Sequence, residues 1–328
     1  MTDSSQTFTP TYSPGKAPGE YRNSGAFAAI KSDGSVVTWG NDGQGGDNSA
    51  VTEDLDANGS PAVEQVFSSG RAFAALREDG SVVTWGYSTR GGDSSGAADE
   101  IDADGSPAVT QLFSTAHAFA ALREDGSVVT WGYDDWGGDS SAIADEINAS
   151  GSPAVDQVFS SGRVFAALRE DGSVVTWGRD YHGGKSSSVA DEIDASNGTP
   201  AVTQIFSVSS AFAALREDGS VVTWGYDDQG GDSSEVKDEI NGDSTPAVTQ
   251  IFSAGYAFAA LRQDGSVVTW GLDPYGGNSA AVADAIDADG TPAVTQVFST
   301  EYSFAALRED GSVVTWGDSA RGGDSAAV

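Results

Sequence analysis

Few residues of this chain could carry acid–base or covalent chemistry. The 328-residue sequence has no cysteine and only two histidines, His117 and His182, so a thiolate nucleophile and a cysteine metal site are both impossible. The two histidines lie in different copies of a repeated sequence. Neither has the recurring serine and aspartate partners that a nucleophilic triad requires. We therefore expect no catalytic residues and a protein that is not an enzyme, with a hydrolase or lyase as the least favoured class.

Acidic segments offer a second kind of chemistry, which is calcium binding. Residues 54–59 read Asp-Leu-Asp-Ala-Asn-Gly and match the opening of a calcium loop, with Asp54, Asp56 and Asn58 as the ligands. A complete loop needs a bidentate acid at its twelfth position, where this chain has Gln65. The alternative interpretation is a solvated acidic turn that keeps a sheet edge soluble. We expect no cofactor and keep calcium at these three residues as a secondary hypothesis.

Aromatic and cationic side chains gather at two sets of variable positions, one just before a repeated Phe and one in the four residues after a repeated Trp-Gly. Seven of the nine tyrosines and both histidines belong to these sets. Tyr, Trp and Arg are the residue types that dominate binding hot spots. The candidate ligand-binding residues are Arg71, Tyr87, Arg90, His117, Trp136, Arg163, Arg179, Tyr181, His182, Tyr256, Tyr275 and Tyr302.

The repeated sequence behind these positions predicts the fold. The octapeptide Asp-Gly-Ser-Val-Val-Thr-Trp-Gly occurs seven times, with its tryptophans 46 residues apart in all but one interval. A period of 40–50 residues that is rich in strand formers is typical of propeller blades. In the repeat from Pro107 to Ser152, residues 107–113, 118–123 and 127–132 read as strands, with a hairpin turn at Asp-Gly. Residues 140–152 fit either an outer strand or one helical turn.

We predict an all-β, seven-bladed β-propeller built from near-identical 46-residue repeats. Residues 17–328 would form a single propeller domain and residues 1–16 an N-terminal extension. We expect every octapeptide tryptophan to be buried between neighbouring blades. Residues 17–21 match the first strand of the other repeats poorly and the last repeat stops at Val328, so we expect the two ends to complete one blade or to meet at one seam.

Strand direction predicts where the variable positions lie. Two chain reversals in each repeat bring both sets to one face, with the Asp-Gly turns on the opposite face. We expect Arg71, His117, Arg163, Tyr256 and Tyr302 to ring the central opening on that face. Further out we expect Tyr87, Trp136, Tyr181 and Tyr275.

The net charge excludes several partners. A formal charge of −33 and a pI near 4.1 repel phosphate backbones and anionic membranes.

The first residues lack a signal-peptide pattern, and no apolar run approaches the roughly 18 residues of a membrane span. We expect no nucleic-acid partner, no membrane insertion and a monomer. A salty medium screens self-repulsion, which favours a cell-surface or extracellular location over the cytoplasm.

The repeats also resemble a known family. The pattern V-x-x-[VIL]-x-S…A-L-x-x-D-G-x-V-x-x-W-G-x-x-x-x-G is similar to that of the regulator of chromosome condensation repeat family, and most similar to its bacterial β-lactamase inhibitors of propeller type. The likeness extends over about residues 17–328. The family's G-Q-L-G after the Trp is replaced by Gly-Gly-Asp in most repeats and by Gly-Gly-Lys at residues 183–185. The resemblance implies a seven-bladed propeller and a bacterial source.

The variable positions lead to a functional hypothesis. Drift of exposed loops would also produce variation, but the Asp-Gly turns, which we expect to be equally exposed, barely vary. We therefore expect a non-catalytic module that binds a protein or a glycan through an aromatic and Arg-rich face. The alternative is a structural or adhesive surface repeat module, or an idealised repeat protein, with no specific ligand.

Overall fold

The computed structural model describes residues 21–58, 60–150, 152–242, 246–289 and 292–324. The chain forms two compact units. Unit 1 comprises Met1–Glu170 with Trp177–Arg179, and unit 2 comprises Asp171–Thr176 with Asp180–Val328. Each unit is described by itself below.

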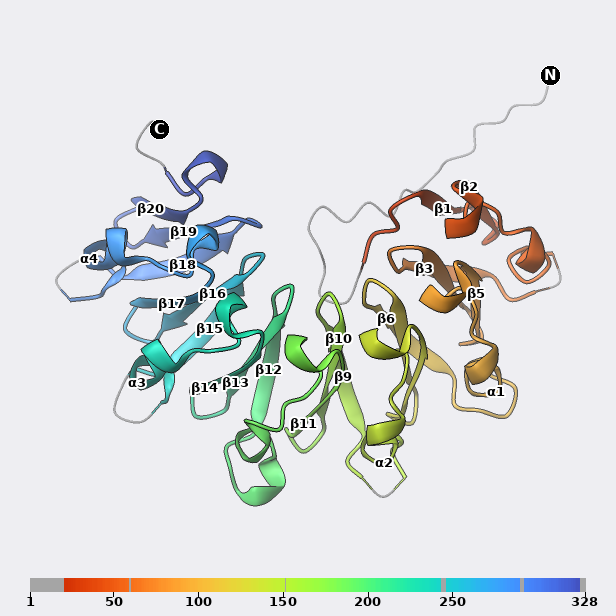
Figure 1. Ribbon diagram of the computed structural model, residues 1–328, viewed down its shortest axis with the longest axis horizontal. Coiled ribbons are helices and arrows are strands. Elements are labelled where there is room, and N and C mark those ends of the chain that lie inside the picture. The colour runs from red at the N-terminus through yellow and green to blue at the C-terminus, as the bar shows by residue number, and fades with distance from the viewer. Residues whose placement is uncertain (1–20, 59, 151, 243–245, 290–291, 325–328) are drawn as a thin grey trace. The chain divides into compact units, whose positions relative to one another are not determined.

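The described residues fold into seven antiparallel sheets that follow one another along the chain (Figure 1). One sheet has two strands and six have three. The sheets are, in order, β1 (Ala26–Ile30) and β2 (Val36–Gly40); β3 (Val63–Ser68), β4 (Ala72–Arg77) and β5 (Val82–Gly86); β6 (Val109–Ser114), β7 (Ala118–Arg123) and β8 (Val128–Gly132); β9 (Val155–Ser160), β10 (Val164–Arg169) and β11 (Val174–Gly178); β12 (Val202–Ser207), β13 (Ala211–Arg216) and β14 (Val221–Gly225); β15 (Val248–Ser253), β16 (Ala257–Arg262) and β17 (Val267–Gly271); and β18 (Val294–Ser299), β19 (Ser303–Arg308) and β20 (Val313–Gly317). These sheets are the blades of a seven-bladed β-propeller, so the predicted all-β fold class is confirmed.

The acidic segments form helical turns, which decides between the two structures that the sequence allowed. Four of these turns are α-helical: α1 (Ala98–Ile101), α2 (Ala144–Ile147), α3 (Lys237–Ile240) and α4 (Ala283–Ile286). A short 3₁₀ turn directly precedes each of them: η4 (Ser95–Ala97), η6 (Ser141–Ile143), η11 (Ser234–Val236) and η13 (Ala280–Val282). The acidic segments without an α-helical turn contain the 3₁₀ turns η2 (Ser49–Val51), η8 (Ala190–Glu192) and η9 (Ala195–Asn197). The last residue of each α-helical turn, such as Ile101 at 2% exposure, is buried in the core between blades. The carboxylates of these segments therefore remain on the solvent side of an apolar anchor.

The Asp-Gly-Ser turn is constant because its residues carry the hairpin. In the turn between β7 and β8, Asp125 accepts hydrogen bonds from both the amide and the hydroxyl of Ser127, and Arg123 donates from Nε to the same hydroxyl at 2.7 Å. Gly126 has φ +76°, and a Cβ there would lie 2.5 Å from Cβ of Ala154 in the next repeat. Its carbonyl accepts the amide of Val155 at 2.9 Å.

The turn is therefore less exposed than we expected from the sequence. Gly126 and Ser127 are buried, and only the acidic residues of the turn reach solvent. For turns like this one, the sequence argument that they are exposed yet constant is wrong in its premise, because their constancy follows from packing against the next blade. The turn at Gly311 in the last repeat differs, since Gly311 is exposed and a Cβ there would meet nothing within 4 Å. Packing therefore explains why these residues are the same in the turns that a following repeat covers. A functional site must be inferred from the contacts that the variable residues make.

Each blade receives the Gly-Gly segment of the preceding repeat. Gly91, at φ +99°, lies against the ring of Phe119, where a Cβ would come within 2.4 Å of the ring. The carbonyl of Gly91 accepts a hydrogen bond from Nε1 of Trp131 at 3.1 Å. The rings of Phe119 and Trp131 stack with their centroids 5.5 Å apart. The same indole-to-glycine bond occurs at Trp85, Trp177, Trp270 and Trp316. The octapeptide tryptophan therefore joins neighbouring repeats.

Two octapeptide tryptophans depart from this pattern. Trp224 is buried, but its Nε1 has no hydrogen-bond partner among the described residues. Trp39 departs in its burial. Six of the seven are 2–4% exposed, but Trp39 is 50% exposed and its stacking partner Phe27 is 64% exposed. Among the described residues, no earlier repeat supplies a Gly-Gly segment for the Trp39 ring. The prediction that all seven are buried is wrong at this position.

The ends of the chain lie outside the described residues, at 1–20 and 325–328. The N-terminal extension at 1–16 and the predicted seam fall there and stay predictions, as does the single domain over residues 17–328. The first described residue, Tyr21, is not in a strand. Its amide donates to Oγ of Ser114 at 2.9 Å and its carbonyl accepts from Ser68, so it contacts the ends of β6 and β3.

Candidate functional site

The two variable sets of each repeat meet at the same end of its sheet. The four residues after each Trp-Gly form a 3₁₀ turn that the sequence did not predict: η1 (Asp42–Gln44), η3 (Ser88–Arg90), η5 (Asp134–Trp136), η7 (Asp180–His182), η10 (Asp227–Gln229), η12 (Asp273–Tyr275) and η14 (Ser319–Arg321). In the third blade the amide of Tyr133 donates to the carbonyl of His117 at 2.9 Å, and Thr115 Oγ1 donates to the carbonyl of Trp136 at 2.9 Å. The strand β7 separates this end from the Asp-Gly-Ser turn. Within each blade the variable residues therefore lie together, opposite the constant turn.

Backbone hydrogen bonds also align the first variable set from blade to blade. In unit 1 the amide of Ser24 donates to the carbonyl of Gly70, Gly70 to Ala116, and Ala116 to Gly162, at 2.8–3.1 Å. In unit 2 Ser209 donates to Gly255 and Gly255 to Glu301. The residue after each of these positions is a variable one. Arg71, His117 and Arg163 are therefore held as a row in unit 1.

The variable side chains of unit 1 form one group, which we call the cationic cluster: Arg71, Tyr87, Arg90, His117, Tyr133, Trp136 and Arg163. The His117 and Trp136 rings stack with centroids 4.1 Å apart. The guanidinium of Arg163 lies 4.7 Å from the Trp136 ring centroid, and that of Arg90 lies 4.8 Å from the Tyr133 centroid. Both of these pairs join residues of neighbouring blades. Arg71 lies over Tyr87 at 5.9 Å.

His117 is the centre of this cluster and is neutral at neutral pH. Burial and, after it, the positive charges of Arg90, Arg71 and Arg163 together lower the pKa of its imidazole to about 4, against an opposing backbone contact to Ala116. Two buried nitrogens of the cluster, His117 Nδ1 and Arg90 Nε, have no hydrogen-bond partner among the residues that the structure describes. An Nε–H of arginine is always a donor, so the cluster contains donor capacity that the chain does not use.

Unit 2 has a different group, which we call the tyrosine cluster: Tyr256, Tyr275, Tyr302 and Arg321. Tyr256 and Tyr275 meet edge to face at 4.7 Å, Tyr275 and Tyr302 stack at 5.2 Å, and the Arg321 guanidinium lies 4.0 Å from the Tyr302 centroid. Arg321 also forms an ion pair with Asp318 at 3.6 Å. The charge of Glu301 raises the pKa of Tyr302.

The remaining candidates are less clustered. His182 stacks on Tyr226 in unit 2, with centroids 5.9 Å apart. Tyr181 is 82% exposed and Arg179 is also exposed. The structure brings in three residues that were not among the named candidates, Tyr133, Tyr226 and Arg321. All three belong to the variable sets, so the same sequence signal identified their positions.

The calcium hypothesis finds no support in the described residues. Asp56 accepts hydrogen bonds from the amide and side chain of Asn58 at 3.1 and 3.0 Å, which closes a local turn. Within the described ranges no three His, Asp or Glu side chains group closely enough to hold a metal ion. The same residues contain no helix with the length and apolar composition needed to span a bilayer.

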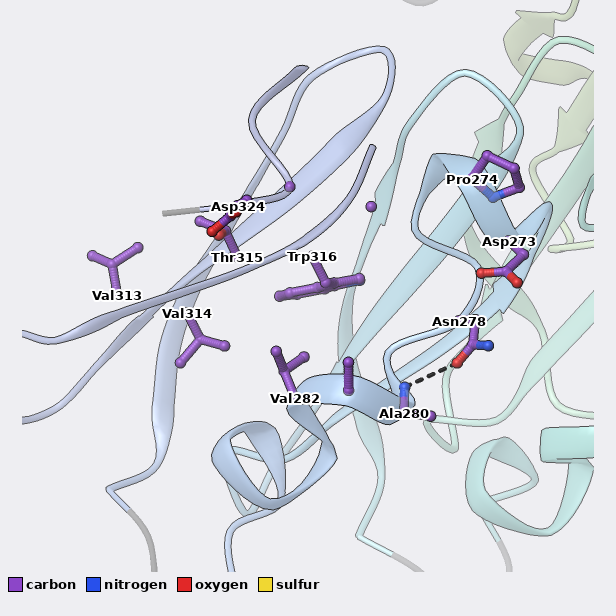
Figure 2. A pocket seen from close by; sticks show the side chains of 13 residues that line it. Asp273, Pro274, Asn278, Ala280, Val282, Val313, Val314, Thr315, Trp316 and Asp324 are labelled. Carbon is purple, nitrogen blue, oxygen red and sulfur yellow. Dashed lines mark hydrogen bonds between the residues drawn. The ribbon is translucent and has the colours of Figure 1, made fainter. Parts of the chain in front are cut away.

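A groove in unit 2 lies beside the η12 turn, whose Asp273 and Pro274 line one end of it (Figure 2). Its walls are mainly frame residues, including Val314, Trp316 and Val282. Val313 on its rim is 52% exposed, whereas the equivalent Val267 packs with Ile286 and Val294. The groove is therefore an uncovered edge of the repeat frame rather than a site built from variable residues.

Comparison with known proteins gives likeness of fold only. No family model matches the chain, and no curated protein matches it. Solved structures with a similar fold include human WBSCR16, at 17% identity over 85% of this chain and 83% of that one, with a TM-score of 0.45. Saccharomyces cerevisiae Prp20p, described with its binding to Gsp1p and histones, gives 18% identity over 81% and 74%, with a TM-score of 0.43. The ectodomain of the Physcomitrella patens receptor kinase CR4 gives 15% over 92% and 72%, with a TM-score of 0.42.

Proposed function

We propose that this protein is a non-catalytic binding module that recognises a macromolecule, either a protein or a glycan, through its variable side chains. The observation that carries the proposal is the assembly of these side chains into Arg–aromatic clusters, at the same end of the blades, on a frame whose other residues are constant. Drift of unrelated surface positions has no reason to produce stacked rings and cation–π pairs between neighbouring blades.

The exposure of the clusters supports a broad contact surface. Tyr87, Tyr133 and Tyr226 are about two-fifths exposed, and Tyr181 is 82% exposed. A small-molecule site would bury most of its ligand in a concave pocket. Side chains of this size that project from short turns suit a macromolecular surface better.

The surroundings of His117 support a binding role over a catalytic one. Its ring stacks on Trp136 and lies among arginines, whereas a general base needs a carboxylate or hydroxyl partner that orients it. The proposal includes a location outside the cytoplasm, because high ionic strength screens a net charge of −33.

Selection from a random peptide library and a printed glycan array tests this function. The immobilised protein is compared with two double variants, Tyr256→Ala with Tyr302→Ala and Arg90→Gln with Arg163→Gln. A matched control replaces Glu78 and Glu124, exposed residues of the constant turns, by glutamine. We expect enriched ligands to lose at least about tenfold in affinity for a cluster variant and to bind the control unchanged.

Two results would contradict the proposal. One is the absence of any enriched ligand on either library, which favours a structural or adhesive module. The other is a set of ligands whose binding is insensitive to all four cluster substitutions. The melting temperature of every variant is measured first, so that unfolding is not mistaken for loss of binding.

A further inference from the structure

We propose that the cationic cluster of unit 1 binds carboxylate groups on an acidic segment of a protein partner. This inference rests on the proposed function and names the chemistry of the ligand at one of its clusters. The tyrosine cluster of unit 2 has no part in it.

The first argument is the arrangement of charge. Three guanidiniums lie around one neutral imidazole, and all three act on its protonation. Arg71 and Arg90 have no carboxylate within ion-pair distance among the described residues. The chain has 49 acidic residues against 16 basic ones. Arginines that have no acidic partner in so acidic a protein are available to an acid from outside.

The second argument is the unused hydrogen-bonding capacity. The N–H group at Arg90 Nε is shielded from solvent and has no hydrogen-bond partner within the part of the chain that the structure describes. A buried donor that stays unsatisfied destabilises the protein, whereas an acceptor brought by a ligand would satisfy it. The ring of Tyr133 lies against the Arg90 guanidinium at 4.8 Å, which fixes the orientation of its planar donor group before a ligand binds.

The third argument selects the class of anion. The arginine fork matches a carboxylate or a phosphate with two parallel hydrogen bonds. A long polyanion such as nucleic acid or a sulfated glycan would extend beyond the cluster into the field of a protein with net charge −33. At physiological salt this field decays over about 8 Å, so a compact group experiences mainly the local arginines. Carboxylates on short side chains of a peptide meet this condition.

The aromatic members of the cluster suit such a segment. Tyr133 and Trp136 meet edge to face at 6.4 Å, and their rings lie beside the arginines that would bind the acid. The methylene groups of a glutamate and a neighbouring apolar side chain can pack on these rings while the carboxylate reaches a guanidinium. The ligand we infer is therefore an acidic segment that also contains apolar residues.

Fluorescence anisotropy with short labelled peptides tests the inference. The probe is a blocked peptide with four glutamates around one phenylalanine, and its matched control has glutamines instead. A phosphoserine version and a sulfated hexasaccharide are further arms. At about 0.15 M salt we expect the glutamate peptide to bind at least about tenfold more tightly than the glutamine peptide.

Two substitutions localise the binding. Arg90→Gln and Arg163→Gln should each weaken binding of the glutamate peptide by at least about tenfold. Arg321→Gln removes the same charge from the tyrosine cluster and should leave the affinity within about twofold. Each variant must melt within a few degrees of the unaltered protein.

Three results would overturn the inference: equal affinity for the glutamate and glutamine peptides, an equal loss on Arg321→Gln, or tighter binding of the sulfated hexasaccharide or the phosphoserine peptide. The outcome is separable from that of the proposed function. If the library selections yield ligands that depend on the clusters but contain no acidic residues, the binding function stands and the carboxylate assignment fails.

Discussion

Individual residues of this protein fall into two groups with separate tasks. Asp125, Ser127 and Arg123 form one hydrogen-bonded unit that closes a hairpin, and its counterparts recur along the chain. His117 and Trp136 occur once and stack on each other. Substitutions in the first group should therefore act on stability, and substitutions in the second on binding and on local electrostatics.

We expect Ser127→Ala to lower the free energy of unfolding by about 1.5–3 kcal/mol, because it removes a buried hydroxyl that bonds to a charged carboxylate. Burial alone would raise the pKa of Asp125, but the hydrogen bonds from Ser127 and the charge of Arg123 outweigh it and the pKa is lowered. Urea denaturation at pH 7 measures the loss. The exposed Ser95 is the control, since Ser95→Ala should change stability by less than about 0.5 kcal/mol.

The pH dependence of stability should reveal His117. Its pKa is about 4 in the folded protein, against 6.5 for an ordinary histidine, so below pH 6.5 the unfolded chain binds a proton that the folded one does not. The stability of the unaltered protein relative to His117→Gln should be highest above pH 6.5, fall between pH 6.5 and 4, and level off below. Paired urea titrations across this range measure it. A constant difference between the two proteins would contradict the assigned environment.

At the scale of elements, each four-residue variable segment, whose last three residues form the 3₁₀ turn, is held at both ends. The first residue of each turn segment is bonded to the loop between the first two strands, and the Gly-Gly that follows lies on the next blade. Positive φ at Gly91 and its contact with Phe119 leave no space for a side chain there. The glycines are therefore joints between blades rather than flexible linkers.

Gly91→Ala should destabilise the protein by more than about 2 kcal/mol, because the added Cβ would lie 2.4 Å from the Phe119 ring at a φ of +99°. Gly96 is a matched control five residues away. A Cβ there meets nothing within 4 Å, and its φ is not positive, so Gly96→Ala should be neutral or slightly stabilising. Thermal melts of the two variants compare them directly, and equal melting temperatures would disprove the joint.

The sequence was sufficient to predict the blades but not their contacts. Strands such as β7 were predictable because a fixed period repeats the same strand formers and the same Asp-Gly turn. The pairing of Trp136 with Arg163, or of Arg90 with Tyr133, depends on which loops of neighbouring blades approach each other. Alternation along a strand contains no such information. The burial of Gly126 could not be predicted from the sequence either, because the residue that covers it, Ala154, belongs to the next repeat.

At the scale of the whole molecule, seven near-identical repeats do not make seven identical environments. The side chain of Trp131 is 4% exposed and donates a hydrogen bond to the carbonyl of Gly91, whereas the side chain of Trp39 is 50% exposed. Identical residues in identical local sequences therefore contribute differently to stability, according to what neighbours their repeat.

Replacing these two tryptophans measures that difference. Trp131→Ala should cost about 3–5 kcal/mol, as for a large buried side chain, and Trp39→Ala less than half as much. Urea denaturation monitored by circular dichroism gives both values under the same conditions. Equal losses would mean that another part of the chain covers Trp39 in solution, as the predicted seam between the two ends requires.

Each four-residue variable segment is fixed at its first residue by a backbone hydrogen bond and after its last residue by a glycine contact. This has a consequence for how the variable surface of such a protein can change in evolution. Because the residues at both ends of each segment are constant, the four residues between them can be exchanged among blades by recombination while the hydrogen bonds and glycine contacts at both ends are retained. A library assembled from the seven natural segments would sample many surfaces at nearly constant melting temperature. New specificity in this architecture can thus arise by shuffling existing loops, before any new mutation appears.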